Sequence, residues 1–279
     1  MLRVWDQAAA YFRQRYATNS QKRFEFKDLA FRKVYSELIE QTIRLLPVHP
    51  SVLKTDLWNE GVEDGRSLAD HVGLRDSDLG PVCTDISRYV CESASRLRTS
   101  NFQLIRATML APPFRAAFDL VLDVSTVDHM PERLRRVWFS SEAFVLKPGG
   151  RLLISFDCRL NLLNELYHRF FTRKLYPEWT LVPSEVRAQL KERGFVIIRE
   201  HAIFIAGFFW GTHRPIFPLA RLLRHKRIFK LLTGMELSKY SRWLSFVAPQ
   251  YVIVARKGNW SQRGALGFGV VATKDNKTV

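Results

Sequence analysis

Side chains that could do chemistry stand where short apolar runs of the sequence end. Asp85 lies in the run at residues 82–86, and a carboxylate ending a strand there can accept hydrogen bonds from both hydroxyls of a ribose. Asp is also a preferred residue at helix N-termini, and a helix is expected to begin near Ser87. Ribose binding and helix capping are equally compatible with the sequence around Asp85.

A histidine follows the strongly apolar run at residues 118–124. His129 is a candidate catalytic base, because a neutral imidazole can accept a proton near pH 7, and Asp128 beside it can orient the ring or act in its place. The alternative is structural, since Asp ahead of a helix that starts with proline often caps that helix. A helix is expected at residues 131–145, so both interpretations stay open.

The sequence lacks the residues that several other kinds of functional site require. The cysteines, Cys83, Cys91 and Cys158, form no Cys-x-x-Cys pair and no Cys/His cluster, which argues against a disulfide framework and a metal site. The sequence also has no Gly-x-Ser-x-Gly nucleophile elbow and no glycine-rich triphosphate loop. The cysteine pattern and the charged N-terminal residues, which do not resemble a signal peptide, favour a cytoplasmic protein.

The candidate residues need a scaffold that brings the ends of the apolar runs together. From residue 51 onward strand-like and helical stretches alternate, and the run at 118–124 largely lacks polar alternation. This pattern predicts an α/β fold, a doubly wound and mostly parallel sheet with helices on both faces. Ligands bind such sheets beyond the carboxyl ends of the strands. The residues to inspect there are Asp56, Asn59, Glu60, Gly61, Asp85, Thr108, Met109, Asp123, Asp128 and His129.

Periodicity and turn residues place the individual elements. The Lys147-Pro-Gly-Gly turn is expected to end one helix and to admit the reversal into the next strand. Strands are expected at residues 51–58, 82–86, 102–107, 118–124, 151–156 and 195–199, and helices at 26–45, 66–72, 89–97, 131–145 and 184–193.

The chain is strongly basic, and its charge is unevenly distributed. The net charge is +16, of which residues 201–259 carry +9 and residues 47–200 only +1. Such a segment suits an anionic membrane surface, an acidic substrate or nucleic acid, and it is equally consistent with solvated Lys and Arg. The longest strongly apolar stretch without a charge has 11 residues, which is too short to span a bilayer.

Several segments, taken in order, resemble class I S-adenosylmethionine-dependent methyltransferases. The run Phe118-Asp-Leu-Val-Leu-Asp, the following Asp-His-Met-Pro and Leu146-Lys-Pro-Gly-Gly-Arg are similar to that family's fourth strand, its loop and the fifth strand. The resemblance covers roughly residues 50–200 and 245–257 and implies a seven-stranded sheet. Further matches are Ala111-Pro-Pro-Phe, Leu181-Val-Pro-Ser-Glu-Val, Leu190-Lys-Glu-Arg-Gly-Phe and Tyr251-Val-Ile-Val-Ala-Arg-Lys.

The resemblance implies S-adenosylmethionine as cofactor. It places Asp85 on the cofactor's ribose and Ile86 against its adenine. Thr108 stands where the family usually has an Asp that accepts the adenine amino group, and a threonine hydroxyl can also accept that hydrogen bond.

The loop after the first strand would face the methionine portion of the cofactor. The family has a glycine-rich loop there, whereas this chain has Trp58 and no glycine before Gly61, which implies a rerouted loop. Asp56 or Glu60 can hold the ammonium group of the cofactor, because a carboxylate forms charge-assisted hydrogen bonds with it.

We therefore expect a methyltransferase-like domain at residues 50–258, with an N-terminal helical cap at 1–49, an insertion at about 202–245 and a flexible tail at 259–279. The expected reaction is methyl transfer to a small-molecule or lipid-like acceptor. The alternatives are an RNA methyltransferase and a non-catalytic methyltransferase-like binding protein. Residues 202–233 mix aromatic and basic side chains and are expected to form a lid that touches an anionic membrane, or else a plain packed helix.

Overall fold

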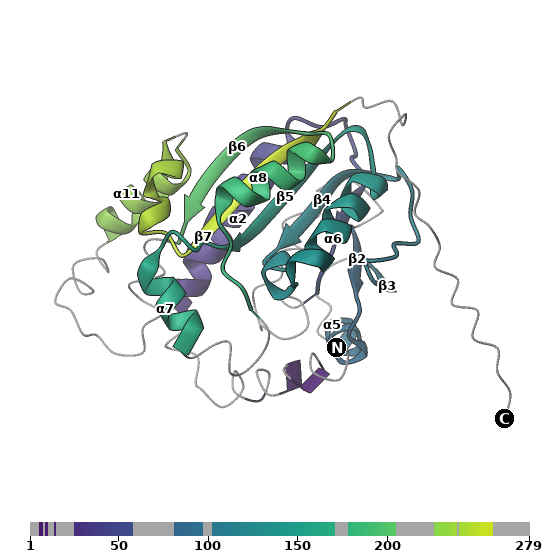
Figure 1. Cartoon of the computed structure of the whole chain (residues 1–279), viewed down its shortest axis with the longest axis horizontal. Helices are drawn as coiled ribbons and strands as arrows, with labels where there is room; N and C mark the ends of the chain where they lie inside the picture. Colours follow the sequence, from purple (N-terminus) through teal and green to yellow (C-terminus); the bar gives the residue numbers. More distant parts are fainter. Residues whose placement is uncertain are drawn as a thin grey trace, which may run out of the picture.

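The central feature of the molecule is an open β-sheet with helices on both faces (Figure 1). The computed structural model describes residues 25–57, 81–96, 102–170, 178–204, 226–238 and 240–258, together with residues 6, 7, 9, 10 and 14. The expected tail at 259–279 and the expected helix at 66–72 lie outside the described residues.

Seven strands form the sheet in the order β3-β2-β1-β4-β5-β7-β6. Strands β1 to β5 pair in parallel, while β7 runs antiparallel to both β5 and β6. The mostly parallel sheet predicted from the alternation of strands and helices is thereby confirmed. The strands are β1 (Val52–Lys54), β2 (Val82–Asp85), β3 (Gln103–Arg106), β4 (Phe118–Val124), β5 (Leu146–Asp157), β6 (Phe195–Ile203) and β7 (Gln250–Lys257).

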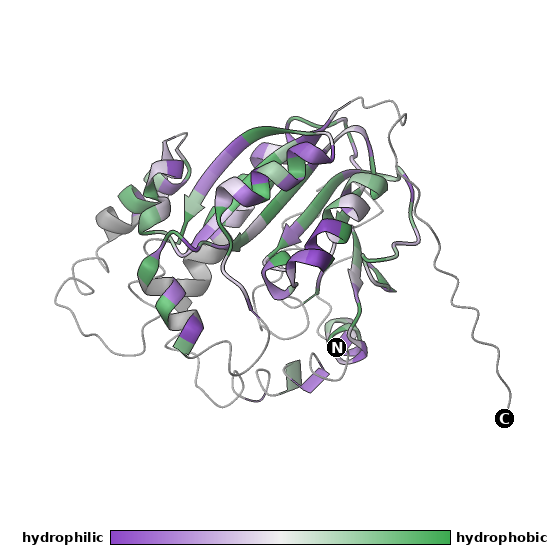
Figure 2. Ribbon diagram, in the orientation of Figure 1, coloured by the Kyte–Doolittle hydropathy of each residue, from purple (hydrophilic) through white to green (hydrophobic). Residues whose placement is uncertain are grey.

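Helices bury their apolar sides against both faces of this sheet. On one face lie α6 (Glu132–Val145) and α8 (Pro183–Glu192), and on the other lies α2 (Glu25–Ile43). Figure 2 shows the middle strands as largely hydrophobic, as expected for strands covered on both sides. No helix among the described residues has both the length and the hydropathy of a membrane span.

Strand alternation decides which helix layer each side chain meets. In β4, Val121 belongs to the core beneath α6, whereas Leu122 belongs to the core beneath α2. In β5, Leu153 also lies beneath α2. Successive side chains of a strand point to opposite faces, so Asp123 lies on the α6 side and Ser155 on the α2 side. The polar residues at the ends of neighbouring strands are thus sorted into two separate groups.

The observed elements differ from the predicted ones mainly in length. β4 occupies the predicted range, but β5 begins at Leu146, directly after α6, and β6 extends to Ile203. β6 is longer because β7 pairs with it as far as Ile203, whereas the early start of β5 pairs with β4, Leu146 lying opposite Phe118. The sequence did not predict α7 (Leu162–Phe170).

A close contact joins the starts of β4 and β5. Lys147 Nζ lies 2.8 Å from Asp119 Oδ2, so an ion pair links the two segments that resemble the methyltransferase family. A Cβ at Gly150 would lie 2.9 Å from the carbonyl oxygen of Lys147 and 3.2 Å from that of Phe118. Only glycine therefore fits at position 150 without a backbone shift.

We predict that Gly150→Ala and Gly234→Ala change stability in opposite directions. The first should lower the free energy of unfolding by about 1–3 kcal/mol, as overpacking of a tight site does. The second should raise it by about 0.5–1 kcal/mol, because alanine is the better helix former and a methyl group added at Gly234, in α11 (Lys226–Glu236), would meet nothing within 4 Å. Urea unfolding measures both variants, and a stable Gly150→Ala protein would contradict the close contact.

Candidate functional site

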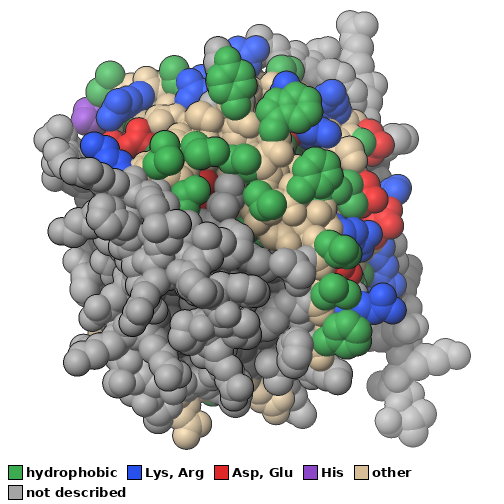
Figure 3. Space-filling view, turned by 90° about the vertical axis from the view of Figure 1, so that its left-hand side faces the viewer, with side chains coloured by type: hydrophobic (Ala, Val, Ile, Leu, Met, Phe, Trp, Pro, Cys, Tyr) green, Lys and Arg blue, Asp and Glu red, His purple; other side chains and the backbone are tan. Residues whose placement is uncertain are grey.

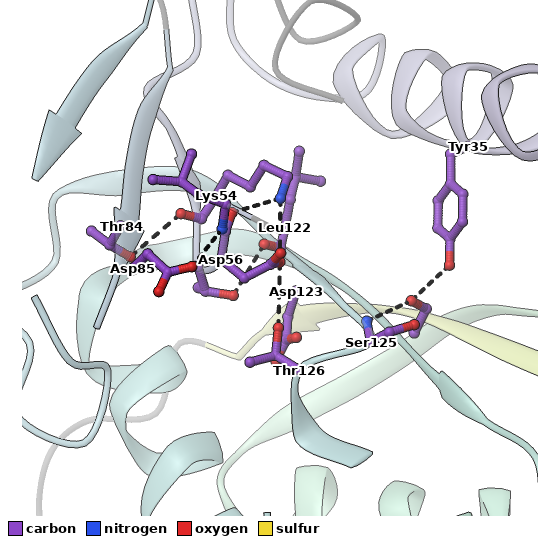
Figure 4. Close-up of polar contacts among 12 residues, drawn as sticks. Tyr35, Lys54, Asp56, Thr84, Asp85, Leu122, Asp123, Ser125 and Thr126 are labelled. Carbon is purple, nitrogen blue, oxygen red and sulfur yellow. Dashed lines mark hydrogen bonds and ion pairs between the residues drawn. The ribbon is translucent and has the colours of Figure 1, made fainter. Parts of the chain in front are cut away.

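The candidate site lies at the carboxyl edge of the sheet, beside β1 and β4. The order of the strands reverses between these two, because β2 and β3 lie beyond β1 while β5 lies beyond β4. Ligands of open α/β sheets bind at this kind of reversal. Polar side chains from β1, β2, β4 and the segments that follow them come together there (Figure 4).

Asp85, at the end of β2, holds the segment that follows β1. Its Oδ2 accepts the backbone N–H of Leu57 at 3.0 Å, and its Oδ1 accepts the N–H of Ser87 at 2.7 Å. Burial raises the pKa of the Asp85 carboxyl to about 6. The helix cap is Ser87 instead, since its Oγ accepts the N–H of Val90 at 3.1 Å and α5 (Arg88–Arg96) begins directly after it.

The end of β1 carries a buried ion pair. Lys54 is fully buried, and its Nζ lies 3.2 Å from Asp56 Oδ2 and donates to the backbone oxygen of Asp56 at 2.6 Å. Thr126, which follows β4, donates its hydroxyl to the same Oδ2 at 3.4 Å. The Asp56 carboxylate, a candidate holder of an ammonium group, is therefore already engaged by a lysine.

Asp123 forms a carboxyl pair with Glu142 in the core beneath α6. Both side chains are fully buried, and the indole Nε1 of Trp138 donates to Asp123 Oδ2 at 2.7 Å. Burial and the charge of Asp123 raise the pKa of Glu142 well above its ordinary value, which favours the protonated form of Glu142. Burial also raises the pKa of Asp123, although its hydrogen bonds oppose that shift. The sequence indicated no role for Glu142.

The short helix η2 (Val127–His129) carries the candidate base. Asp128 is fully buried, and its Oδ2 accepts the N–H of Asp157 at 3.1 Å. The His129 side chain is 21% exposed, and its Nε2 lies 3.8 Å from Asp128 Oδ1. The capping alternative is wrong, because Pro131 occupies the N-cap of α6 and no side chain caps it. The carboxylate of Asp128 therefore lies next to the imidazole of His129 without capping α6.

A second polar cluster joins α2 to the ends of β4, β5 and β7. Tyr35 donates its hydroxyl to Ser155 Oγ at 2.7 Å and lies 3.1 Å from Gln250 Oε1. Ser125 has a φ of 56°, in the left-handed region that non-glycine residues rarely adopt. Its N–H donates to Ser155 Oγ at 3.1 Å and its own Oγ accepts from Gln250 Nε2 at 3.2 Å, which holds the turn between β4 and η2.

The remaining predicted site residues make fewer contacts with the groups described above. Thr108 Oγ1 accepts the N–H of Leu110 at 3.1 Å, and Met109 is buried in the core. Ile86 is half-buried beside Asp85. The positions outside the described residues are Asn59, Glu60 and Gly61.

The ligand edge is acidic although the chain as a whole is basic. Burial is the main cause of the raised pKa of Asp85, Asp123 and Tyr35, and the negative charge of Asp56 adds to all three shifts. Asp128 and Asp157 add to the shift of Tyr35, so these carboxylates act on the same region. An acidic region attracts cations and repels polyanions. In the described ranges, no group of three or more His, Cys, Asp or Glu side chains is placed to hold a metal ion.

Comparison with known proteins supports a specific family. Residues 51–154 match the family described as a methyltransferase domain. A comparison with curated proteins finds no match.

Solved structures share the fold at low sequence identity. An S-adenosylmethionine-dependent methyltransferase from Mesorhizobium loti is 12% identical, with a TM-score of 0.50 over 83% of this chain and 100% of that one. The PH0226 protein from Pyrococcus horikoshii is 15% identical, with a TM-score of 0.53 over 86% and 92% of the two chains. The [4+2]-cyclase SpnF is 15% identical, with a TM-score of 0.50 over 80% and 79%. At such identities these structures show the fold alone.

We predict that Lys54→Met lowers the free energy of unfolding by about 3–5 kcal/mol, because it leaves the Asp56 carboxylate without its buried counter-charge. The double variant Lys54→Met/Asp56→Asn should recover most of that loss. Arg88→Met, which breaks an exposed ion pair with Glu92, should change stability little. Urea unfolding at pH 7 compares the three, and a single variant as stable as the double would contradict the pairing.

Proposed function

We propose that this chain is a class I S-adenosylmethionine-dependent methyltransferase and that it transfers the methyl group to a small-molecule or lipid-like acceptor. The observation that carries the proposal is the acidic edge at the strand reversal of a chain whose net charge is +16. S-adenosylmethionine supplies a methyl group bound to a positively charged sulfur. An edge rich in carboxylates favours such a cation over neutral or anionic ligands.

The residues at this edge fit the ribose end of the cofactor. Asp85 is half-buried, and each of its oxygens accepts one backbone N–H, so a second acceptor site remains on each oxygen for a ribose hydroxyl. The apolar side chain of Ile86 is half-buried next to it and can pack against an adenine. Asp56 neutralises Lys54, so the buried lysine does not oppose the charge of the cofactor.

His129 and Asp128 fit the removal of a proton from a hydroxyl acceptor. Methyl transfer from a sulfonium needs alignment, exclusion of water and, for a hydroxyl, a base. We assign the base to His129, which is partly exposed beside the strand reversal. Asp128 is a positioning residue, because its buried carboxylate faces the imidazole and the N–H of Asp157.

The charge distribution favours a small or lipid-like acceptor over RNA. The edge that would receive the methyl acceptor is lined by carboxylates, which repel a phosphate backbone. The basic excess lies elsewhere, with +9 in residues 201–259. An RNA substrate would have to bring its phosphates past the acidic groups around His129.

We predict that the affinity for S-adenosylmethionine rises as the pH increases through about 6. Burial raises the pKa of Asp85 to about 6, and the ribose hydroxyls donate to its ionised form, so protonation below this pH competes with binding. Asp85→Asn should weaken binding about 10- to 100-fold, as expected for hydrogen bonds to a charged group, and should flatten the pH profile.

Calorimetry at pH 5 to 8 measures this profile, with Glu92→Gln as a matched control on the exposed side of α5. Thermal unfolding without ligand checks that the Asp85 variant is folded. Equal affinity of the variant and the unchanged protein would place the ribose elsewhere. No binding by the unchanged protein would overturn the proposed function.

We predict that His129→Ala lowers methyl transfer to a hydroxyl acceptor by about 10²–10⁴-fold while cofactor affinity stays nearly constant. Transfer of labelled methyl from S-adenosylmethionine to a cell extract, separated into lipid, small-molecule and RNA fractions, measures this loss and identifies the acceptor class. Label confined to RNA would contradict the proposed acceptor. Unchanged transfer by the variant would remove His129 from the reaction.

A further inference from the structure

Exposed apolar side chains gather on one side of the molecule. Ten of the sixteen large apolar side chains that are exposed in the described residues lie in two segments, 160–170 and 231–247. They include Leu162, Trp243 and Phe246, which are 67%, 66% and 68% exposed. Figure 3 views the side on which α7 and α11 lie and shows hydrophobic side chains gathered among Lys and Arg. We call these two segments the apolar surface.

Hydrogen bonds hold the two segments of the apolar surface together. Asn161 Nδ2, at the start of α7, donates to the backbone oxygen of Val247 at 2.9 Å. The backbone N–H of Cys158 donates to the oxygen of Pro249 at 2.8 Å. Between these anchors, η4 (Ser241–Phe246) buries Ser241 and Ser245 and leaves its aromatic side chains outward. The exposed aromatic side chains therefore belong to an element, η4, that hydrogen bonds hold in place.

The apolar surface adjoins the candidate site. Cys158 directly follows Asp157, whose N–H is bound by the carboxylate of Asp128. The backbone N–H of Trp179 donates to the backbone oxygen of Asp128 at 2.6 Å. The segment at 160–170 therefore begins a few residues after Asp157, which is bonded to the neighbour of His129.

Basic side chains accompany the apolar ones. The guanidinium of Arg242 lies 5.1 Å from the ring centre of Trp243, and both side chains are exposed. Lys230, on α11, is exposed beside Leu231. Trp and Tyr are enriched at membrane interfaces, and anionic headgroups attract Lys and Arg.

We propose that the apolar surface docks on an anionic lipid bilayer, from which the methyl acceptor enters the site. The part about the acceptor rests on the proposed function, whereas docking itself does not. Apolar side chains enter the boundary of the acyl chains while Arg242 and Lys230 meet the headgroups. The sequence predicted membrane contact for residues 202–233, of which residues 205–225 lie outside the described residues and residues 231–233 belong to this surface.

Co-sedimentation with vesicles tests the docking. Phosphatidylcholine vesicles that contain phosphatidylglycerol should bind the protein, pure phosphatidylcholine vesicles should not, and high salt should release it. Trp243→Ala/Phe246→Ala should weaken binding about 100-fold, since both side chains lose their burial in the bilayer. Lys230→Gln/Arg242→Gln should weaken it about 30-fold. Phe144→Ala, an exposed aromatic on α6, is the matched control and should bind normally.

Calorimetry with S-adenosylmethionine on the same samples separates the two proposals. Cofactor binding without vesicle binding would overturn the docking surface alone, and vesicle binding without cofactor binding would overturn the proposed function alone. Vesicle binding that the Trp243→Ala/Phe246→Ala variant retains would also overturn the assignment. Self-association that this variant abolishes, without binding to vesicles, would assign the surface to a second copy instead.

Discussion

The parallel pairing of β1 with β4 is the constraint on which the site depends. The strand order reverses at this pair, so the segments after β1, β2 and β4 meet at one edge of the sheet. Asp56, Asp85 and Thr126 come from three separate parts of the sequence, and the pairing of β1 with β4 on one side and β2 on the other brings them together. A single hydrogen bond, from Thr126 to Asp56, already joins two of the three segments.

Burying several carboxylates at one edge of the sheet costs free energy, because each charge loses its hydration. Three arrangements in the fold reduce this cost. Lys54 supplies a positive charge to Asp56, backbone N–H groups bind Asp85, and burial beside Asp123 raises the pKa of Glu142, which favours its uncharged form. Burial also raises the pKa of Asp85 to about 6, so its charge depends on pH close to neutrality.

The carboxyl edge of the sheet and the surface formed by α7 and η4 differ in the chemical groups that they attract. The carboxyl edge favours a cation, while the neighbouring surface of α7 and η4 combines aromatic, aliphatic and basic side chains. The hydrogen bond between Asn161 and Val247 joins α7 to the end of η4, and Asn161 lies a few residues after Asp157.

The sequence by itself determined the sheet and the position of Asp85, because strand alternation, helix periodicity and turn residues are local signals. It also placed His129 beside the strand reversal. Only the tertiary structure decided that Glu142 lies close to Asp123 in the core and that Tyr35 reaches Ser155, 120 residues further along the chain. Such contacts depend on which strands pair and which helix covers each face, and no local pattern of residues carries that information.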